Sequence, residues 1–234
     1  MKTIGLIGGM SWESSAAYYR IINETVRDRI HPLENAKSLM STVNFHEIER
    51  LQHAGQWDDL GKMLEDAAKR LEAGGADCVV LCTNTMHKLA SWIENAVSIP
   101  LIHIADATAE QIKTQGMKKV GLLGTGFTME QDFYKGRLTG KYGLEVIVPN
   151  KSDRDIVHRV IYDELCAGKI VETSKLEYVR IMQALIAKDC EGIILGCTEI
   201  MLLVGQQDSS VPVFDTTTIH AVAAVDFALE KIPA

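Results

Sequence analysis

Short apolar runs alternate with longer helical patterns along this chain. The first run covers residues 4–7 and stops at Gly8-Gly9, and residues 13–29 follow with the periodicity of an amphipathic helix. Such alternation is typical of βαβ units and predicts an α/β fold with mainly parallel sheets. Further strands are expected at residues 39–45, 78–81, 99–104, 119–123, 144–148, 193–195 and 211–214. Further helices are expected at residues 57–73, from the third strand to about residue 94, and at 128–138, 153–167, 173–188 and 217–230.

The two halves of the chain share short motifs. Gly5-Leu6-Ile7-Gly8 matches Gly121-Leu122-Leu123-Gly124 at a separation of 116 residues, and Cys82-Thr83 matches Cys197-Thr198 at 115. Leu71 and Leu185, both in expected helices, are 114 residues apart. These matches predict a duplicated chain: two pseudo-symmetric open parallel-sheet lobes with the active site in the cleft between them. The N-terminal lobe is expected to span residues 1–103, completed by 211–234, and the C-terminal lobe residues 104–210.

Composition narrows the classes of partner. The 234 residues are 47% apolar and 24% charged, which is ordinary for a soluble domain with a sizeable core. The net charge of -7 disfavours nucleic acid, because no basic stripe is present to neutralise phosphates. The chain start lacks a signal-peptide pattern, and no apolar run approaches the roughly 18 residues that span a bilayer. We therefore expect no membrane partner and a cytoplasmic location.

The cysteines suggest chemistry rather than disulfides or metal. Their number is odd, their spacing is irregular and no Cys-x-x-Cys occurs, so neither a disulfide framework nor a metal site is expected. Cys78, Cys166 and Cys190 are interpreted as structural thiols. Cys82 and Cys197 differ, because each follows an apolar strand and precedes hydroxyl residues. Ligands of parallel sheets bind at that carboxyl end of the strands.

Two thiols on opposite sides of a ligand suit inversion of an α-carbon, where one group removes a proton and the other returns one. A thiol with an ordinary pKa near 8.5 serves as either acid or base once its surroundings tune it. Donors from Thr83, Asn84, Thr85 and Thr198 would stabilise the carbanion. The loop with Thr125, like residues 8–11, ends a strand and opens a helix, and is expected to cradle a carboxylate. Its glycine spacing is not that of a nucleotide-binding fingerprint.

The histidines attract less attention at this stage. His87 follows Cys82 by five residues, which allows a place near the cleft, but a helix-packing role is the favoured interpretation. The pattern assigns no position to His103 and His220, which lie near the ends of late elements.

The sequence resembles the aspartate/glutamate racemase superfamily, in its aspartate racemase branch. The motifs that carry the resemblance are residues 8–14 (GGMSWES), 82–87 (CTNTMH), 128–134 (TMEQDFY) and 196–199 (GCTE). The resemblance implies an amino-acid substrate, activity without pyridoxal phosphate or metal, and a homodimer. It also implies Cys82 and Cys197 as catalytic residues. Substrate contacts are expected from Met10, Gln52, Thr83, Asn84, Thr85, Thr125, Thr198 and Glu199.

Departures from the family patterns leave the substrate open. Glutamate racemases of cell-wall synthesis carry Asp-Ser where this chain has Gly8-Gly9, and histidine where it has Glu199. Some aspartate racemases grip the side-chain carboxylate with a lysine, but residues 163–166 read DELC here. The arginine partner corresponds to Arg50 or Gln52. Other polar amino acids, a maleate isomerase, a hydantoin racemase, an arylmalonate decarboxylase and a non-catalytic amino-acid-binding relative remain alternatives.

Overall fold

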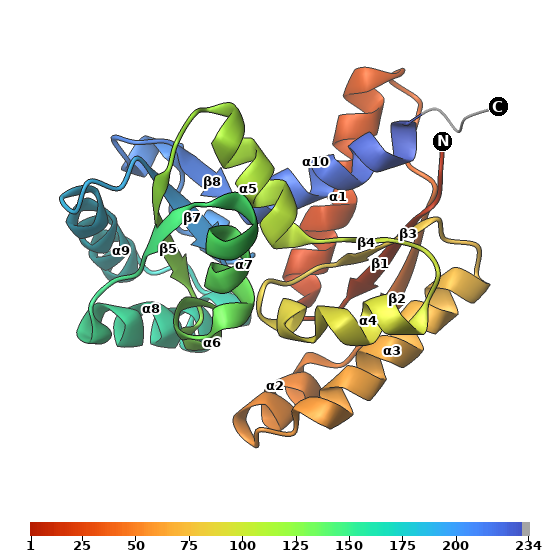
Figure 1. Cartoon of the computed structure of the whole chain (residues 1–234), viewed down its shortest axis with the longest axis horizontal. Coiled ribbons are helices and arrows are strands. Elements are labelled where there is room, and N and C mark those ends of the chain that lie inside the picture. Colours follow the sequence, from red (N-terminus) through yellow and green to blue (C-terminus); the bar gives the residue numbers. More distant parts are fainter. Residues whose placement is uncertain (231–234) are drawn as a thin grey trace. The chain divides into compact units, whose positions relative to one another are not determined.

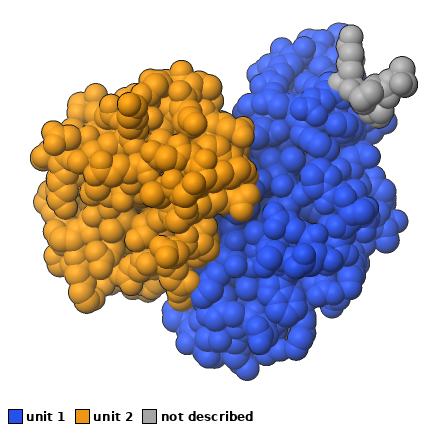
Figure 2. Space-filling view, viewed as in Figure 1, with its two compact units in different colours: residues 1–103, 220–234 blue, residues 104–219 orange. Residues whose placement is uncertain are grey.

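The computed structural model describes residues 1–230 and divides the chain into two compact units, shown as ribbons in Figure 1 and coloured separately in Figure 2. Unit 1 contains Met1–His103 and the segment that begins at His220, and unit 2 contains Ile104–Ile219. Each unit has its own four-stranded sheet with parallel strands. The predicted α/β class with two related parallel-sheet lobes is confirmed.

The sheet of unit 1 has the strand order β2-β1-β3-β4. Its strands are β1 (Ile4–Gly8), β2 (Ser38–Thr42), β3 (Cys78–Leu81) and β4 (Leu101–Ile102). Its helices are α1 (Trp12–Arg29), α2 (Phe45–His53), α3 (Trp57–Ala73), the 3₁₀ helix η1 (Thr85–Leu89) and α4 (Ala90–Ala96).

Residues of β3 alternate between two apolar layers, as the pleat of a strand requires. Cys78 and Val80 lie in a layer with side chains of α1 and of α10 (Thr216–Leu229). Val79 and Leu81 lie in the opposite layer, with side chains of α2 and α3. A strand buried on both faces is typical of parallel sheets that are covered by helices on both sides.

Unit 2 repeats this arrangement, with the strand order β6-β5-β7-β8. Its strands are β5 (Lys119–Gly124), β6 (Glu145–Ile147), β7 (Gly192–Gly196) and β8 (Val213–Asp215). Its helices are α5 (Ile104–Thr114), α6 (Gly126–Glu130), α7 (Asp132–Tyr142), α8 (Lys151–Asp163) and α9 (Glu172–Ile186). Three 3₁₀ helices complete it: η2 (Leu165–Ala167), η3 (Ile200–Leu202) and η4 (Gln206–Asp208).

The return to unit 1 comes later than the sequence predicts. Residues 211–234 are expected to complete the first lobe, but β8 pairs with β7 through Ile194 and Phe214 and so belongs to the second sheet. Burial of Phe214 in the core of unit 2 explains this placement. Helix α10 begins in unit 2, and only its residues from His220 onward belong to unit 1. Residues 231–234 of the predicted segment lie outside the described residues.

Two further elements differ from the prediction. The expected strand at residues 39–45 ends at Thr42, because the Asn44 side chain caps α2 by accepting a hydrogen bond from the Glu47 N–H at 3.3 Å. The expected strand at 99–104 shortens to Leu101–Ile102, because α5 begins at Ile104. Neither α2 nor α5 is predicted from the sequence.

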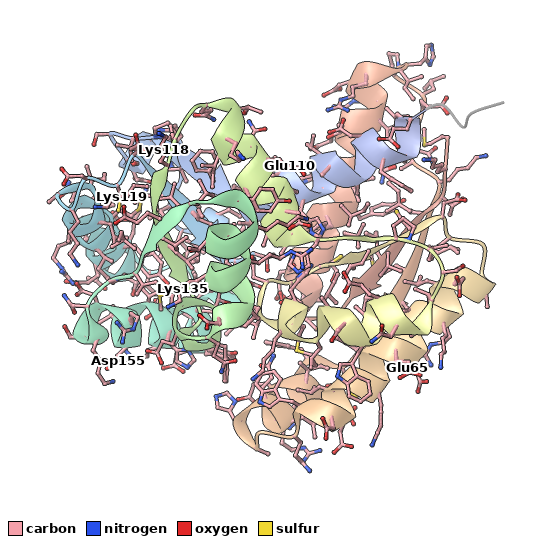
Figure 3. All side chains as sticks on the ribbon, in the orientation of Figure 1. Glu65, Glu110, Lys118, Lys119, Lys135 and Asp155 are labelled. Carbon is pink, nitrogen blue, oxygen red and sulfur yellow. The ribbon has the colours of Figure 1, made fainter. Side chains whose placement is uncertain are left out.

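Charged side chains lie on the outer faces of the helices. Figure 3 labels several of them, including Glu65 on α3 and Asp155 on α8. Within residues 1–230, no helix combines the length and the apolar character needed to cross a membrane.

Candidate active site

The turn after β7 joins a thiol to a carboxylate. The Cys197 Sγ donates a hydrogen bond to Glu199 Oε2 at 3.0 Å, and the Thr198 hydroxyl donates to the same oxygen at 2.8 Å. All three side chains are buried, and Cys197 keeps 9% of its surface exposed. Burial, followed by the negative charge of Glu199, raises the pKa of the Cys197 thiol well above its ordinary value. Cys197 is therefore a protonated thiol at neutral pH, with a proton acceptor in direct contact.

The glycine before Cys197 allows the two central strands to approach closely. Gly196 pairs with Gly124 of β5, and a Cβ on Gly196 would lie 2.7 Å from Leu122 Cδ1 and 2.9 Å from the Leu123 carbonyl oxygen. Only glycine fits this position without a shift of β5. The next residue, Cys197, is thus the first side chain beyond the packed end of the strand.

The turn after β3 has a different chemical character. Cys82 is 0% exposed and lies in the apolar layer with Ile4, Leu6 and Tyr18, continuing the alternation of Cys78 and Val80. Burial raises the pKa of the Cys82 thiol. Cys82 is therefore a core thiol as the structure places it. Thr83, which follows it, is 8% exposed.

The registers of the two sheets show that Cys82 and Cys197 are not equivalent. Ile7 pairs with Leu81 in the first sheet, and its repeat partner Leu123 pairs with Leu195 in the second. The pairing of β1 with β3 ends at Leu81, and the Thr83 N–H donates back to the Leu81 carbonyl oxygen at 2.8 Å, whereas β5 and β7 stay paired as far as Gly124 and Gly196. Cys82 is therefore one residue, and Cys197 two residues, beyond the last pair that the two sheets share. The catalytic assignment of both thiols stays a prediction.

The loops after β1 and β5 each end a strand and open a helix, as the sequence predicts. Thr125 follows β5 and caps α6, because its hydroxyl oxygen accepts the Thr128 N–H at 3.3 Å. Its neighbour Gly124 pairs with Gly196, so Thr125 and Cys197 leave the sheet on adjacent strands. In unit 1, Gly9 has a φ of +91°, and a Cβ there would collide with the Val43 carbonyl oxygen. Glycine is therefore required where the loop passes the end of β2.

The remaining predicted substrate residues of unit 1 are buried around the turn after β3. Met10 and Met86 lie in the same apolar cluster, and the Gln52 amide donates to the Met86 sulfur at 3.1 Å. Asn84 and Thr85 are buried directly after Thr83. Met10, Gln52, Thr83, Asn84 and Thr85 thus belong to unit 1, and Thr125, Cys197, Thr198 and Glu199 belong to unit 2.

Sequence reasoning missed several polar groups behind the first turn. The Ser14 hydroxyl donates to the Cys82 carbonyl oxygen at 2.9 Å. His87 Nδ1 lies 2.7 Å from the Thr83 carbonyl oxygen. The Ser14 contact joins α1 to a turn 68 residues later and has no signal in the sequence, whereas the His87 contact spans four residues within the motif at residues 82–87. Among residues 1–230, no group of three or more His, Cys, Asp or Glu side chains is arranged to hold a metal ion.

Comparison with known proteins identifies the family. The family model described as Asp/Glu/Hydantoin racemase matches residues 7–224. The chain belongs to this racemase family. The match covers both sheets and all of the candidate site residues.

Individual relatives agree with this membership. A candidate Asp/Glu racemase from Yersinia pestis is 57% identical, with a TM-score of 0.92 over 98% of this chain and 100% of that one. An aspartate racemase homologue from Pyrococcus horikoshii OT3 is 38% identical, with a TM-score of 0.85 over the same shares. The broad specificity amino-acid racemase RacX of Bacillus subtilis is 25% identical over 175 residues, or 72% of each chain. The family match and these relatives together support amino-acid racemase activity for this chain.

Proposed function

We propose that this racemase-family chain inverts the α-carbon of acidic amino acids, aspartate or glutamate, without an organic cofactor or a metal ion. The observation that carries the proposal is the Cys197–Glu199 contact of 3.0 Å at the carboxyl end of a central strand. There a thiol is held beside a group that accepts its proton. Such a pair can present thiol or thiolate to a substrate as the reaction direction demands.

Each catalytic cycle needs one base and one acid on opposite faces of the substrate Cα. The base breaks the Cα–H bond and takes the proton, and the electron pair delocalises onto the substrate carboxylate. The acid then delivers a proton to the other face. On the Cys197 side, the thiol passes its proton to Glu199, and the resulting thiolate takes the Cα proton. Backbone N–H groups and the Thr125 hydroxyl are the proposed donors that stabilise the negative charge on the substrate carboxylate, and the Thr198 hydroxyl joins them only if it turns away from Glu199, to which it donates in this structure.

The second acid/base group comes from the Cys82–Thr83 turn in this proposal. In the two-thiol form predicted from the sequence, the Cys82 Sγ would have to leave the apolar layer that holds it. The Thr83 hydroxyl, which belongs to a residue that is 8% exposed, is the competing group, but a hydroxyl is a far weaker acid than a thiol and would need a further base to take its proton. Substitution of each residue separately distinguishes the two forms.

Substrate range and assembly belong to the same proposal. The side-chain carboxylate is expected to meet Gln52 in place of the arginine that some relatives use, and the lysine of those relatives has no counterpart in residues 163–166, which broadens the range towards other polar amino acids. We also propose a cytoplasmic homodimer with an amino acid as its partner, and sedimentation velocity of the purified chain tests the dimer.

One experiment tests the function. Purified protein with no added cofactor is incubated in D₂O with L-aspartate, L-glutamate and a panel of other amino acids. Deuterium at Cα together with the D-isomer is the expected result. Maleate and a substituted hydantoin in parallel reactions test the related activities. The absence of exchange and inversion with every amino acid would overturn the proposal, and conversion of maleate alone would assign an isomerase instead.

A further inference from the structure

Three buried histidines meet behind the turn after β3. The ring centroids of His87 and His103 are 4.5 Å apart, and those of His87 and His220 are 5.7 Å apart. Tyr18 of α1 contacts His220 edge-on at 5.6 Å. All four side chains are at least 95% buried. The sequence pattern favours a helix-packing role for His87 and does not indicate where the other two histidines lie.

The hydrogen bonds define how these rings are held. A carbonyl oxygen only accepts, so His87 donates its Nδ1–H to the Thr83 carbonyl oxygen at 2.7 Å. By the same rule His220 donates its Nε2–H to the Ile102 carbonyl oxygen at 2.6 Å. The His220 Nδ1 then accepts the Tyr18 hydroxyl at 2.8 Å. The His220 ring is therefore fixed on both sides, and the other two rings pack around it.

The cluster stands where the chain enters and leaves unit 1. His103 is the last residue before the chain passes into unit 2, and His220 is the first residue after it returns. His87 lies in η1, directly after the turn that carries the candidate acid/base group. One set of packed rings thus connects this turn to both crossings of the chain.

We propose that His87 is a positioning residue for the reaction: it holds the Thr83 carbonyl, and through it the orientation of the Cys82–Thr83 turn, while His103 and His220 hold the His87 ring in place. This inference rests on the proposed racemase function. The Thr83 residue lies beyond the end of β3, where the sheet no longer fixes its peptide planes. Orientation of a reacting group matters because a misplacement of about 1 Å can cost roughly 100-fold in rate.

Two variants of the same shape separate the hydrogen bond from packing. Asparagine and leucine have the same branched outline, but only the Asn amide has a nitrogen near the place of the histidine Nδ1. We expect His87→Leu to lower kcat about 30-fold with little change in KM, and His87→Asn to retain activity within about threefold, because misorientation of a reacting group acts on the chemical step. His31→Leu, the same substitution at an exposed loop residue, is the control and should leave activity unchanged.

The loss should also be one-sided. If only the first turn is displaced, the enantiomer whose Cα proton faces Cys197 still exchanges deuterium in His87→Leu while inversion falls. General destabilisation would lower exchange and inversion together in both enantiomers. Equal activity of His87→Asn and His87→Leu, or a proportional loss of exchange and inversion, would overturn the positioning role.

A measurement without substrate keeps the test independent of the function. Amide hydrogen exchange of residues 82–85 and alkylation of Cys82 are followed on the whole chain. Both are expected to accelerate at least about tenfold in His87→Leu and not in His87→Asn, because only the former frees the turn. Unchanged exchange and alkylation in both variants would overturn the inference. If the wild type converts no amino acid while these differences persist, the proposed function fails and the contact that orders the turn remains.

Discussion

The turns after β3 and β7 begin with the same two residues, Cys-Thr, yet they offer different chemistry. After β7, the thiol of Cys197 contacts a carboxylate and lies at the edge of the buried region. After β3, the thiol of Cys82 is fully buried in an apolar layer. The strands before the turns differ as well, because β5 and β7 stay paired as far as Gly196, whereas β1 and β3 pair only as far as Leu81.

This comparison shows that two turns with the same sequence motif can differ in the pairing of the strands that lead into them. Glycine at position 196 lets β5 and β7 close up and moves the cysteine one step beyond the packed strand. In the first sheet the pairing ends at Leu81, and Cys82 follows it directly. The polar groups behind the turns differ as well, with Glu199 behind one and a histidine cluster behind the other.

The largest expected effect is at Cys197. Cys197→Ala removes the thiol that contacts the Glu199 carboxylate, and we expect inversion to fall at least about 1,000-fold. Cys190→Ala, at a buried thiol of the same unit, is the matched control and should lose less than about tenfold, since it removes packing only. Initial rates by polarimetry with both enantiomers provide the measurement. Equal losses in the two variants would contradict the assignment.

Substitutions at Cys82 and Thr83 test the comparison most directly. We expect Cys82→Ala to lower inversion about 100-fold, as loss of a general acid or base does, and to lower the free energy of unfolding by about 1–2 kcal/mol through the cavity that it leaves. Thr83→Val, which keeps the shape and removes the hydroxyl, should lower inversion by less than about tenfold, because a hydroxyl is a far weaker acid than a thiol. Denaturant unfolding and inversion assays on both variants decide. A loss of less than about tenfold in Cys82→Ala, together with a deep loss in Thr83→Val, would overturn the two-thiol form.

Glu199→Gln tests the turn after β7, because the rate of Cys197 alkylation should rise while kcat falls. The carboxylate raises the pKa of Cys197, so its loss should lower that pKa and speed alkylation of the thiol at a given pH. The same substitution removes the proton acceptor, so kcat should fall about tenfold. Glu172→Gln, at an exposed first-turn residue of α9, is the control. A variant with full activity would show that Glu199 does not receive the Cys197 proton.

Much of the fold was predictable because its signals are local. Apolar runs and glycine stops placed the strands around Ile4–Gly8 and Cys78–Leu81, and the repeated motifs indicated two parallel-sheet lobes. The site is less predictable. The sequence contains the one-residue step, since the glycine motifs repeat at 116 residues and the Cys-Thr pairs at 115, but only the strand pairing shows that it falls after Leu81 and Leu195, and pairing is a non-local property. The His103 and His220 contacts were invisible for the same reason.

The smallest expected effect concerns acid sensitivity, to which His220 behind the first turn should contribute. Burial lowers the pKa of His220 from its usual 6.5 to about 4, so the folded state resists a proton that the unfolded chain accepts. The stability linked to His220 is therefore complete above pH 6.5 and is lost as pH falls towards 4, by about 1.4 kcal/mol at pH 5.5. Denaturant unfolding at pH 7.5 and 5.5 measures this loss. His220→Gln keeps a donor for the Ile102 carbonyl but does not titrate, so its stability should change less over this interval. An equal change in both proteins would place the acid sensitivity elsewhere, and the histidine cluster would then no longer distinguish the first turn from the second.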